Sequence, residues 1–308
     1  MKSSSETFRS SYLYLAGAMF IAGSAVVASK ILAGSMPSFL ATELGILVGL
    51  LFLIPLLFLV KKETFQTDLK TNAILLIQAL FGVFLYRIFT FVGLQYTSAA
   101  NSGLITSCSP VIVALLAFLF LREKLTITRM IGILVVVIGM LAINIYPFLN
   151  SNMESSNAVK GNLFILLAVL CEALFSILSK VSCKPMSALY RTTIITFYAF
   201  ILLLPFSVYD GLQYDWVGIE LSSVICVLYY GFFVSFLSYV FWFKGIEKVP
   251  ASNAAVFTSV VPVSSIVLSA VVLKETVMAV HMVGLGCVIG GILISCLGLG
   301  RKRKGLAD

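Results

Sequence analysis

Ten runs of apolar residues divide this chain, and each run is as long as a helix that crosses a lipid bilayer. A spanning helix needs about 20 apolar residues. Hydrophobic residues make up 60% of the chain and charged residues 11%, which excludes a soluble globular enzyme, a disordered chain and a disulfide scaffold. We therefore predict an all-α polytopic membrane protein with ten transmembrane helices. The runs cover about 11–30, 38–60, 71–95, 99–121, 128–147, 161–180, 191–209, 219–243, 251–273 and 279–299.

The distribution of lysine and arginine predicts the orientation of these helices. Short loops that carry positive charge stay in the cytoplasm. With the N-terminus inside, 17 of the 21 basic residues fall in inside segments, three fall outside, and Arg87 lies within a span. We expect both termini in the cytoplasm and the protein in the cytoplasmic membrane. The net charge of +8 is then explained by inside loops and a basic tail that contacts anionic lipid, so we expect no nucleic-acid partner.

The second half of the sequence repeats the first. An offset of 152 residues aligns 81–141 with 233–293 without a gap, and about 20 of the 61 positions are identical. Each repeat holds five predicted spans, and because five is odd the second repeat enters the membrane in the opposite sense. The predicted domains are a first five-helix repeat at 1–150, a second at 151–299 and a basic tail at 300–308. Inverted repeats of this kind are a common basis for alternating access.

Several short motifs carry a family resemblance, and most occur once in each repeat. The chain resembles the drug/metabolite transporter superfamily, specifically its EamA-type members, over nearly its whole length. The resemblance implies a fold of ten helices and a transport function, and it says almost nothing about the substrate. The chain departs from the family at Glu43 and Glu172, where other residue types are usual. The motifs are Gly23-Ser24 through Lys30, Thr97 to Asn101 through Pro110, Leu121 to Leu125, Gly132, Gly139, Pro250 to Asn253 through Pro262, Leu273 to Glu275, Gly284 and Gly291.

Three ionisable residues lie inside predicted spans, where a charge costs a few kcal/mol or more and often marks a functional site. Glu43 and Arg87 lie at similar depths from the outer surface, so we expect an ion pair. That pair is either structural or part of a gate or substrate contact. Glu172 lies about eleven residues in from the outside, near the midplane. It is either a site of proton binding and release or a protonated side chain that is hydrogen-bonded to a neighbouring helix.

Small polar residues and aromatic residues supply the other substrate or proton site candidates. Asn101, Thr106 and Ser107 precede Pro110 in the fourth span, and Asn253, Thr258 and Ser259 precede Pro262 in the ninth. We expect both prolines to kink their helices. The polar residues either line a cavity or allow close helix packing. Tyr86 flanks Arg87, and Tyr239 lies at the place in the second repeat that matches Arg87. Both tyrosines are further candidates for contact with an apolar substrate.

Two other features have simpler interpretations. Glu123 and Glu275 lie in tight hairpins, where we expect them to cap helices and close the hairpin, with a functional role as the alternative. Gly286 and Gly290 form a GxxxG motif, which predicts close helix contact within one chain or between two.

These observations favour a secondary transporter that moves small metabolites such as amino acids, by export and with or without proton coupling. A lipid scramblase or flippase on the same fold is an alternative. A membrane-embedded enzyme is a weaker one, because the chain has one histidine and lacks HExxH and GxSxG motifs. We expect no catalytic residues, metal or cofactor. The expected partners are a small-molecule substrate and the bilayer, with the protein a monomer or a homodimer.

Overall fold

We describe the protein from a computed structural model that covers residues 4–33, 35–59, 69–97, 99–123, 125–149, 158–181, 186–274 and 279–304. Some side chains inside these ranges, including that of Asn101, lie outside the described part. All regular elements in these ranges are helical, as expected where lipid offers the backbone no hydrogen-bond partners. The protein is therefore a helical membrane protein.

The first half of the chain forms seven α-helices and one π-helix. They are α1 (Ser4–Ala33), α2 (Ser38–Leu59), α3 (Leu69–Ala79), η1 (Leu80–Leu85), α4 (Tyr86–Tyr96), α5 (Ala99–Thr106), α6 (Ser109–Leu121) and α7 (Ile127–Leu149). The second half repeats this order. Its elements are α8 (Ala158–Leu178), α9 (Ala188–Gln213), α10 (Leu221–Tyr229), η2 (Tyr230–Ser238), α11 (Tyr239–Ile246), α12 (Ala251–Phe257), α13 (Val260–Val272) and α14 (Ala279–Lys304).

Among the described residues, seven helical segments are long and apolar enough to cross a membrane, and each coincides with a predicted run. The other three predicted runs, 99–121, 128–147 and 279–299, contain shorter apolar helices within the described residues. The seven segments are Ser10–Ser29, Ser38–Leu59, Leu69–Tyr96, Val159–Leu178, Ala188–Gln213, Leu221–Ile246 and Ala251–Val272.

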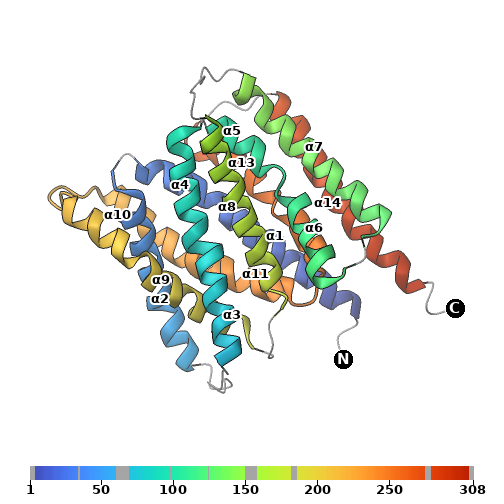
Figure 1. Cartoon of the computed structure of the whole chain (residues 1–308), viewed down its shortest axis with the longest axis horizontal. Coiled ribbons are helices and arrows are strands. Elements are labelled where there is room, and N and C mark those ends of the chain that lie inside the picture. Colours follow the sequence, from blue (N-terminus) through green and yellow to red (C-terminus); the bar gives the residue numbers. More distant parts are fainter. Residues whose placement is uncertain are drawn as a thin grey trace.

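The largest cluster of buried side chains joins helices from both halves of the chain. Leu15 of α1, Leu50 of α2 and Leu75 of α3 pack there with Ile195 of α9 and Phe243 of α11. Many large apolar side chains face outward instead, as in a protein that is surrounded by lipid. α7 and α14 pack against each other along one flank of the molecule (Figure 1).

A short turn interrupts the helix near each of the two prolines. α5 ends at Thr106 and Pro110 is the second residue of α6, while α12 ends at Phe257 and Pro262 is the third residue of α13. Proline has no N–H group and clashes with the preceding turn, so a new helix begins near it. Each break places the N-terminal end of a half-helix inside the protein, beside polar residues.

Candidate functional site

Two π-helical segments position the central polar residues. η1 separates α3 from α4, and η2 separates α10 from α11. When η2 is shifted back by 152 residues it covers 78–86, which encloses η1. Tyr86 and Arg87 directly follow η1, Tyr230 begins η2, and Tyr239 directly follows it. π-helical turns are rare and occur frequently at functional sites.

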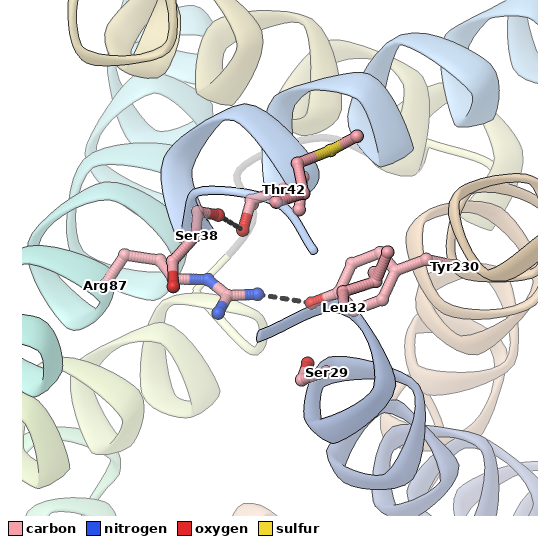
Figure 2. A pocket seen from close by; sticks show the side chains of 8 residues that line it. Ser29, Leu32, Ser38, Thr42, Arg87 and Tyr230 are labelled. Carbon is pink, nitrogen blue, oxygen red and sulfur yellow. Dashed lines mark hydrogen bonds between the residues drawn. The ribbon is translucent and has the colours of Figure 1, made fainter. Parts of the chain in front are cut away.

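Arg87 pairs with a tyrosine of the other half of the chain. Its Nη2 atom donates a hydrogen bond to the Tyr230 hydroxyl (Figure 2). The phenols of Tyr86 and Tyr239 also lie near the guanidinium group. The Tyr230 ring packs against Gly45 of α2, which fixes the position of the hydroxyl.

The predicted ion pair between Glu43 and Arg87 is wrong. Glu43 is buried at 4% exposure, and neither of its carboxylate oxygens has a hydrogen-bond partner. The residues of α2 that share a cavity with Arg87 are Ser38, Ala41 and Thr42, and Glu43 is not among them. Successive helical residues point about 100° apart, so similar depth in the membrane did not determine which side chain faces Arg87.

A small cavity adjoins the guanidinium group of Arg87. Its volume is about 60 Å³, enough for a few water molecules or one small polar group. Figure 2 shows the hydroxyls of Ser29 and Thr42 near the guanidinium, with Thr42 donating to the carbonyl of Ser38. The wall consists of Ser29, Leu32, Met36, Ser38, Ala41, Thr42, Arg87 and Tyr230.

Glu172 of α8 lies near the same group of residues. Ser109, the first residue of α6, donates a hydrogen bond of 3.1 Å to Glu172 Oε2. Tyr86 interacts electrostatically with both Glu172 and Arg87, and Tyr239 interacts with Arg87 and Tyr86. Four of the predicted site residues, Glu172, Tyr86, Arg87 and Tyr239, therefore form one electrostatic neighbourhood.

The polar residues near the two prolines turn toward their own backbone. Thr106 and Ser107 both donate to the carbonyl of Gly103. Thr258 and Ser259 likewise donate to carbonyls three residues earlier. These hydroxyls satisfy backbone groups around the helix breaks and are not part of the wall of the Arg87 cavity.

Asn253 of the ninth predicted span is buried and only partly satisfied by hydrogen bonds. The amide nitrogen of Asn253 lies 3.4 Å from the Ser295 carbonyl and 3.5 Å from the Tyr12 hydroxyl. Its buried Oδ1 atom has no hydrogen-bond partner. The side chain of Asn101 lies outside the described residues.

Glu123 caps a helix of the opposite half of the chain. Its carboxylate accepts hydrogen bonds from the backbone N–H groups of Ala251 (2.8 Å) and Ser252 (3.1 Å), the first residues of α12. Lys180 lies nearby and donates to the Glu247 carbonyl. Burial lowers the pKa of Lys180, an effect that the carboxylates of Glu123 and Glu247 oppose. Glu275 lies outside the described residues.

The GxxxG motif makes no close contact with the part of the chain that the structure describes. A Cβ atom added at Gly286 or Gly290 would meet no atom within 4 Å among the described residues. α14 instead approaches α7 through Gly284 and Gly291. Gly284 and Gly291 are seven residues apart and therefore lie on one face of α14, which contacts α7. Gly286 and Gly290 lie on a different face of the same helix.

Sequence analysis missed five residues that this structure places at or near polar centres. Ser29, Ser38, Thr42 and Tyr230 line the Arg87 cavity, and buried Arg191 donates to the Ser179 carbonyl at 2.9 Å. A single serine or threonine at the end of an apolar run does not by itself indicate a binding site in the sequence. The adjacent pair Tyr229-Tyr230 within an otherwise apolar run is the one pattern that was available to identify part of this site.

Comparison with known proteins identifies the family. The sequence profile of the EamA-like transporter family matches the chain twice, over residues 9–145 and 159–297. The chain belongs to the EamA-like transporter family. The transporter YetK of Bacillus subtilis (strain 168), which is described as uncharacterized, is 38% identical over 93% of this chain and 86% of its own length.

More distant family relatives extend to plants. A WAT1-related protein of Arabidopsis thaliana is 24% identical over 91% of this chain and 84% of its own length. A solved crystal structure superposes with a TM-score of 0.78 at 18% identity, covering 94% of this chain and 98% of that one. The structural likeness supports the fold, and the family establishes a membrane transporter.

Proposed function

We propose that this membrane transporter is a secondary exporter of small metabolites such as amino acids, that it works by alternating access, and that Glu172 couples transport to protons. The observation that carries the proposal is the neighbourhood of Glu172, Tyr86 and Arg87. It combines residues of α4 and α8, which belong to different matched stretches of the family profile. A site between two such halves changes its exposure when one half moves against the other.

The proposal includes ten spans in two inverted repeats with both termini in the cytoplasm. Contacts between α7 and α14 support the repeat. A Cβ atom at Gly132 would lie 2.8 Å from the Gly291 carbonyl, and one at Gly139 would lie 2.8 Å from the Gly284 carbonyl. Gly284 and Gly291 are the repeat partners of Gly132 and Gly139 at the offset of 152. Such reciprocal contacts are typical of a pseudo-twofold axis.

Contacts between the two halves occur at both ends of α9, which fits alternating access. At one end Tyr214 donates to the Ser35 carbonyl at 2.9 Å, and the hydroxyls of Ser35 and Ser223 lie 2.8 Å apart. At the other end Glu123 caps α12. An alternating-access cycle breaks one set of contacts at a time.

The test is flux in sealed proteoliposomes. Purified full-length protein is reconstituted with a mixture of radiolabelled L-amino acids, and uptake is measured with and without a pH gradient. We expect the gradient to drive uptake in the wild type. Glu172→Gln should abolish the response to the gradient and leave exchange between labelled and unlabelled substrate measurable, because the amide cannot titrate.

A matched control is Glu220→Gln, which removes an exposed carboxyl group at the start of α10. This variant should behave as the wild type. Gradient-driven uptake that survives in Glu172→Gln would reject Glu172 as the coupling residue. Absence of any flux with amino acids would reject the proposed substrate class.

A further inference from the structure

Arg87 carries a permanent positive charge that no described carboxylate neutralises. Glu43 has no hydrogen-bond partner, and Glu172 accepts its hydrogen bond from Ser109. The acceptor for Arg87 is the neutral hydroxyl of Tyr230. A guanidinium group has five N–H donors and stays protonated in proteins. Inside a membrane span such a charge is costly unless a counter-charge or water approaches it.

The cavity beside Arg87 has room for a ligand group that carries that counter-charge. Three hydroxyl-bearing residues line the cavity together with Arg87 and Tyr230. In Figure 2, Ser38 and Thr42 lie above the guanidinium group and Ser29 lies below it. Its volume of about 60 Å³ is far below the roughly 300 Å³ or more of a pocket that encloses a drug-sized ligand. The cavity therefore fits one charged group of a ligand and not the whole ligand.

We infer that this cavity is an anion subsite that binds a single carboxylate group of the transported molecule, with Arg87 as its principal ligand and the hydroxyl of Ser29 as a further donor in its wall. The inference rests on the proposed transport function and specifies the substrate class as small organic monocarboxylates, amino acids included. A planar carboxylate matches the two parallel donors of a guanidinium fork. One guanidinium balances one carboxylate, whereas a phosphate ester would leave net negative charge in the span.

Tyr230 acts here as a positioning residue. Its hydroxyl holds one N–H group of Arg87, and its ring is fixed between α2 and η2 by contact with Gly45. The guanidinium plane is therefore held from one side while its other donors remain available to a ligand. Removal of the hydroxyl alone should weaken carboxylate binding while the charge of Arg87 stays in place.

The test compares matched pairs of ligands that differ in their charged group. Purified full-length protein in nanodiscs is titrated with acetate against acetamide, 4-methylpentanoate against 4-methylpentanamide, and L-leucine against L-leucinamide. Binding is read from the shift in thermal unfolding and from calorimetric titration. We expect the carboxylate of each pair to bind and its amide to bind roughly 10- to 100-fold more weakly, as for loss of a charged hydrogen-bonded pair.

Variants separate charge from geometry. Arg87→Gln should abolish the preference for carboxylates, Arg87→Lys should retain part of it, and Tyr230→Phe should lower carboxylate affinity without abolishing the preference. Lys70→Gln removes an exposed positive charge from the same span and should leave binding unchanged. If Arg87→Gln does not fold, the Arg87→Lys and Tyr230→Phe titrations decide the question.

Three outcomes would overturn the inference: equal binding of carboxylates and amides, a carboxylate preference that persists in Arg87→Gln, and absence of binding by all the carboxylates. Flux measurements distinguish this failure from failure of the proposed function. Carboxylates that bind but are not transported would leave the subsite in place and reject the transport proposal. Transport of the amides and not of the carboxylates would support a transport function and reject the carboxylate subsite.

Discussion

At the scale of single residues, the buried polar groups of this protein differ in how well they are satisfied. Arg87, Glu172 and Glu123 each have a hydrogen-bond partner on another helix or connection. Glu43 has none, although its carboxyl group is buried. A buried polar group without a partner costs free energy that its neighbours must offset. Replacement of Glu43 by an apolar residue should therefore measure how much an unsatisfied buried carboxyl group destabilises this fold.

We predict that Glu43→Met raises the midpoint of thermal unfolding. Methionine has a similar volume and removes the unsatisfied carboxyl group, which we expect to stabilise the protein by about 1–3 kcal/mol. The measurement is thermal unfolding of the purified protein in detergent. Leu44→Met, at the neighbouring and partly buried position, is the matched control and should change stability little. A lower midpoint in Glu43→Met would mean that Glu43 has a stabilising partner.

At the scale of elements, the π-helical segment η2 depends on a close approach to α2. A Cβ atom at Gly231 would overlap Val48 and would lie 2.7 Å from the Gly45 carbonyl. Glycine is required there because the two helices meet almost backbone to backbone. This contact holds Tyr230, the preceding residue, at the Arg87 cavity.

We predict that Gly231→Ala destabilises the protein by about 1–3 kcal/mol, the cost of an extra methyl group in a tightly packed contact. Thermal unfolding measures the effect. Gly286→Ala is the control, because a methyl group there meets no atom within 4 Å and alanine favours helix. Equal behaviour of the two variants would show that η2 is able to move away from α2 without cost.

The cap that Glu123 forms on α12 leads to another prediction at this scale. The first N–H groups of a helix have no partner within the helix, and Glu123 binds those of Ala251 and Ser252. Glu123→Ala should speed hydrogen exchange at these two amides by about tenfold or more. The amide of Tyr190, capped by Ser187 at the start of α9, is the internal control. Unchanged exchange at Ala251 and Ser252 would remove Glu123 as the cap.

At the scale of the whole molecule, orientation in the membrane can be tested at two exposed positions. Val217 lies in the connection before α10, and Lys248 lies in the connection after α11. The candidate span Leu221–Ile246 separates them, so we expect them to lie on opposite sides of the membrane. The distribution of basic residues predicts that Lys248 faces the cytoplasm.

We predict that Val217→Cys reacts with an impermeant maleimide in intact cells and that Lys248→Cys reacts only after permeabilisation. The experiment uses a background in which the six native cysteines are replaced. Val217 is 88% exposed, so access of the reagent does not limit the reaction. The opposite labelling pattern would invert the proposed topology and place both termini outside.

The sequence by itself determined the helical class and the positions of the apolar segments. These properties depend on hydropathy along the chain, which is local. The residues of the central neighbourhood, Glu172, Arg87, Tyr86 and Tyr239, were identified in this way because ionisable and aromatic groups inside apolar runs are conspicuous. The glycines at the α7–α14 contact were also visible as a repeated pattern.

Only the tertiary structure decided which of these side chains meet. A π-helical turn holds more residues than an α-helical turn, so η1 and η2 rotate the residues that follow away from the face that a 3.6-residue period predicts. Arg87 consequently meets Tyr230 and not Glu43, and Thr42 lines the cavity in place of its neighbour. Pairing between residues far apart in sequence depends on how each helix is rotated against its neighbours, and hydropathy carries no information about that rotation.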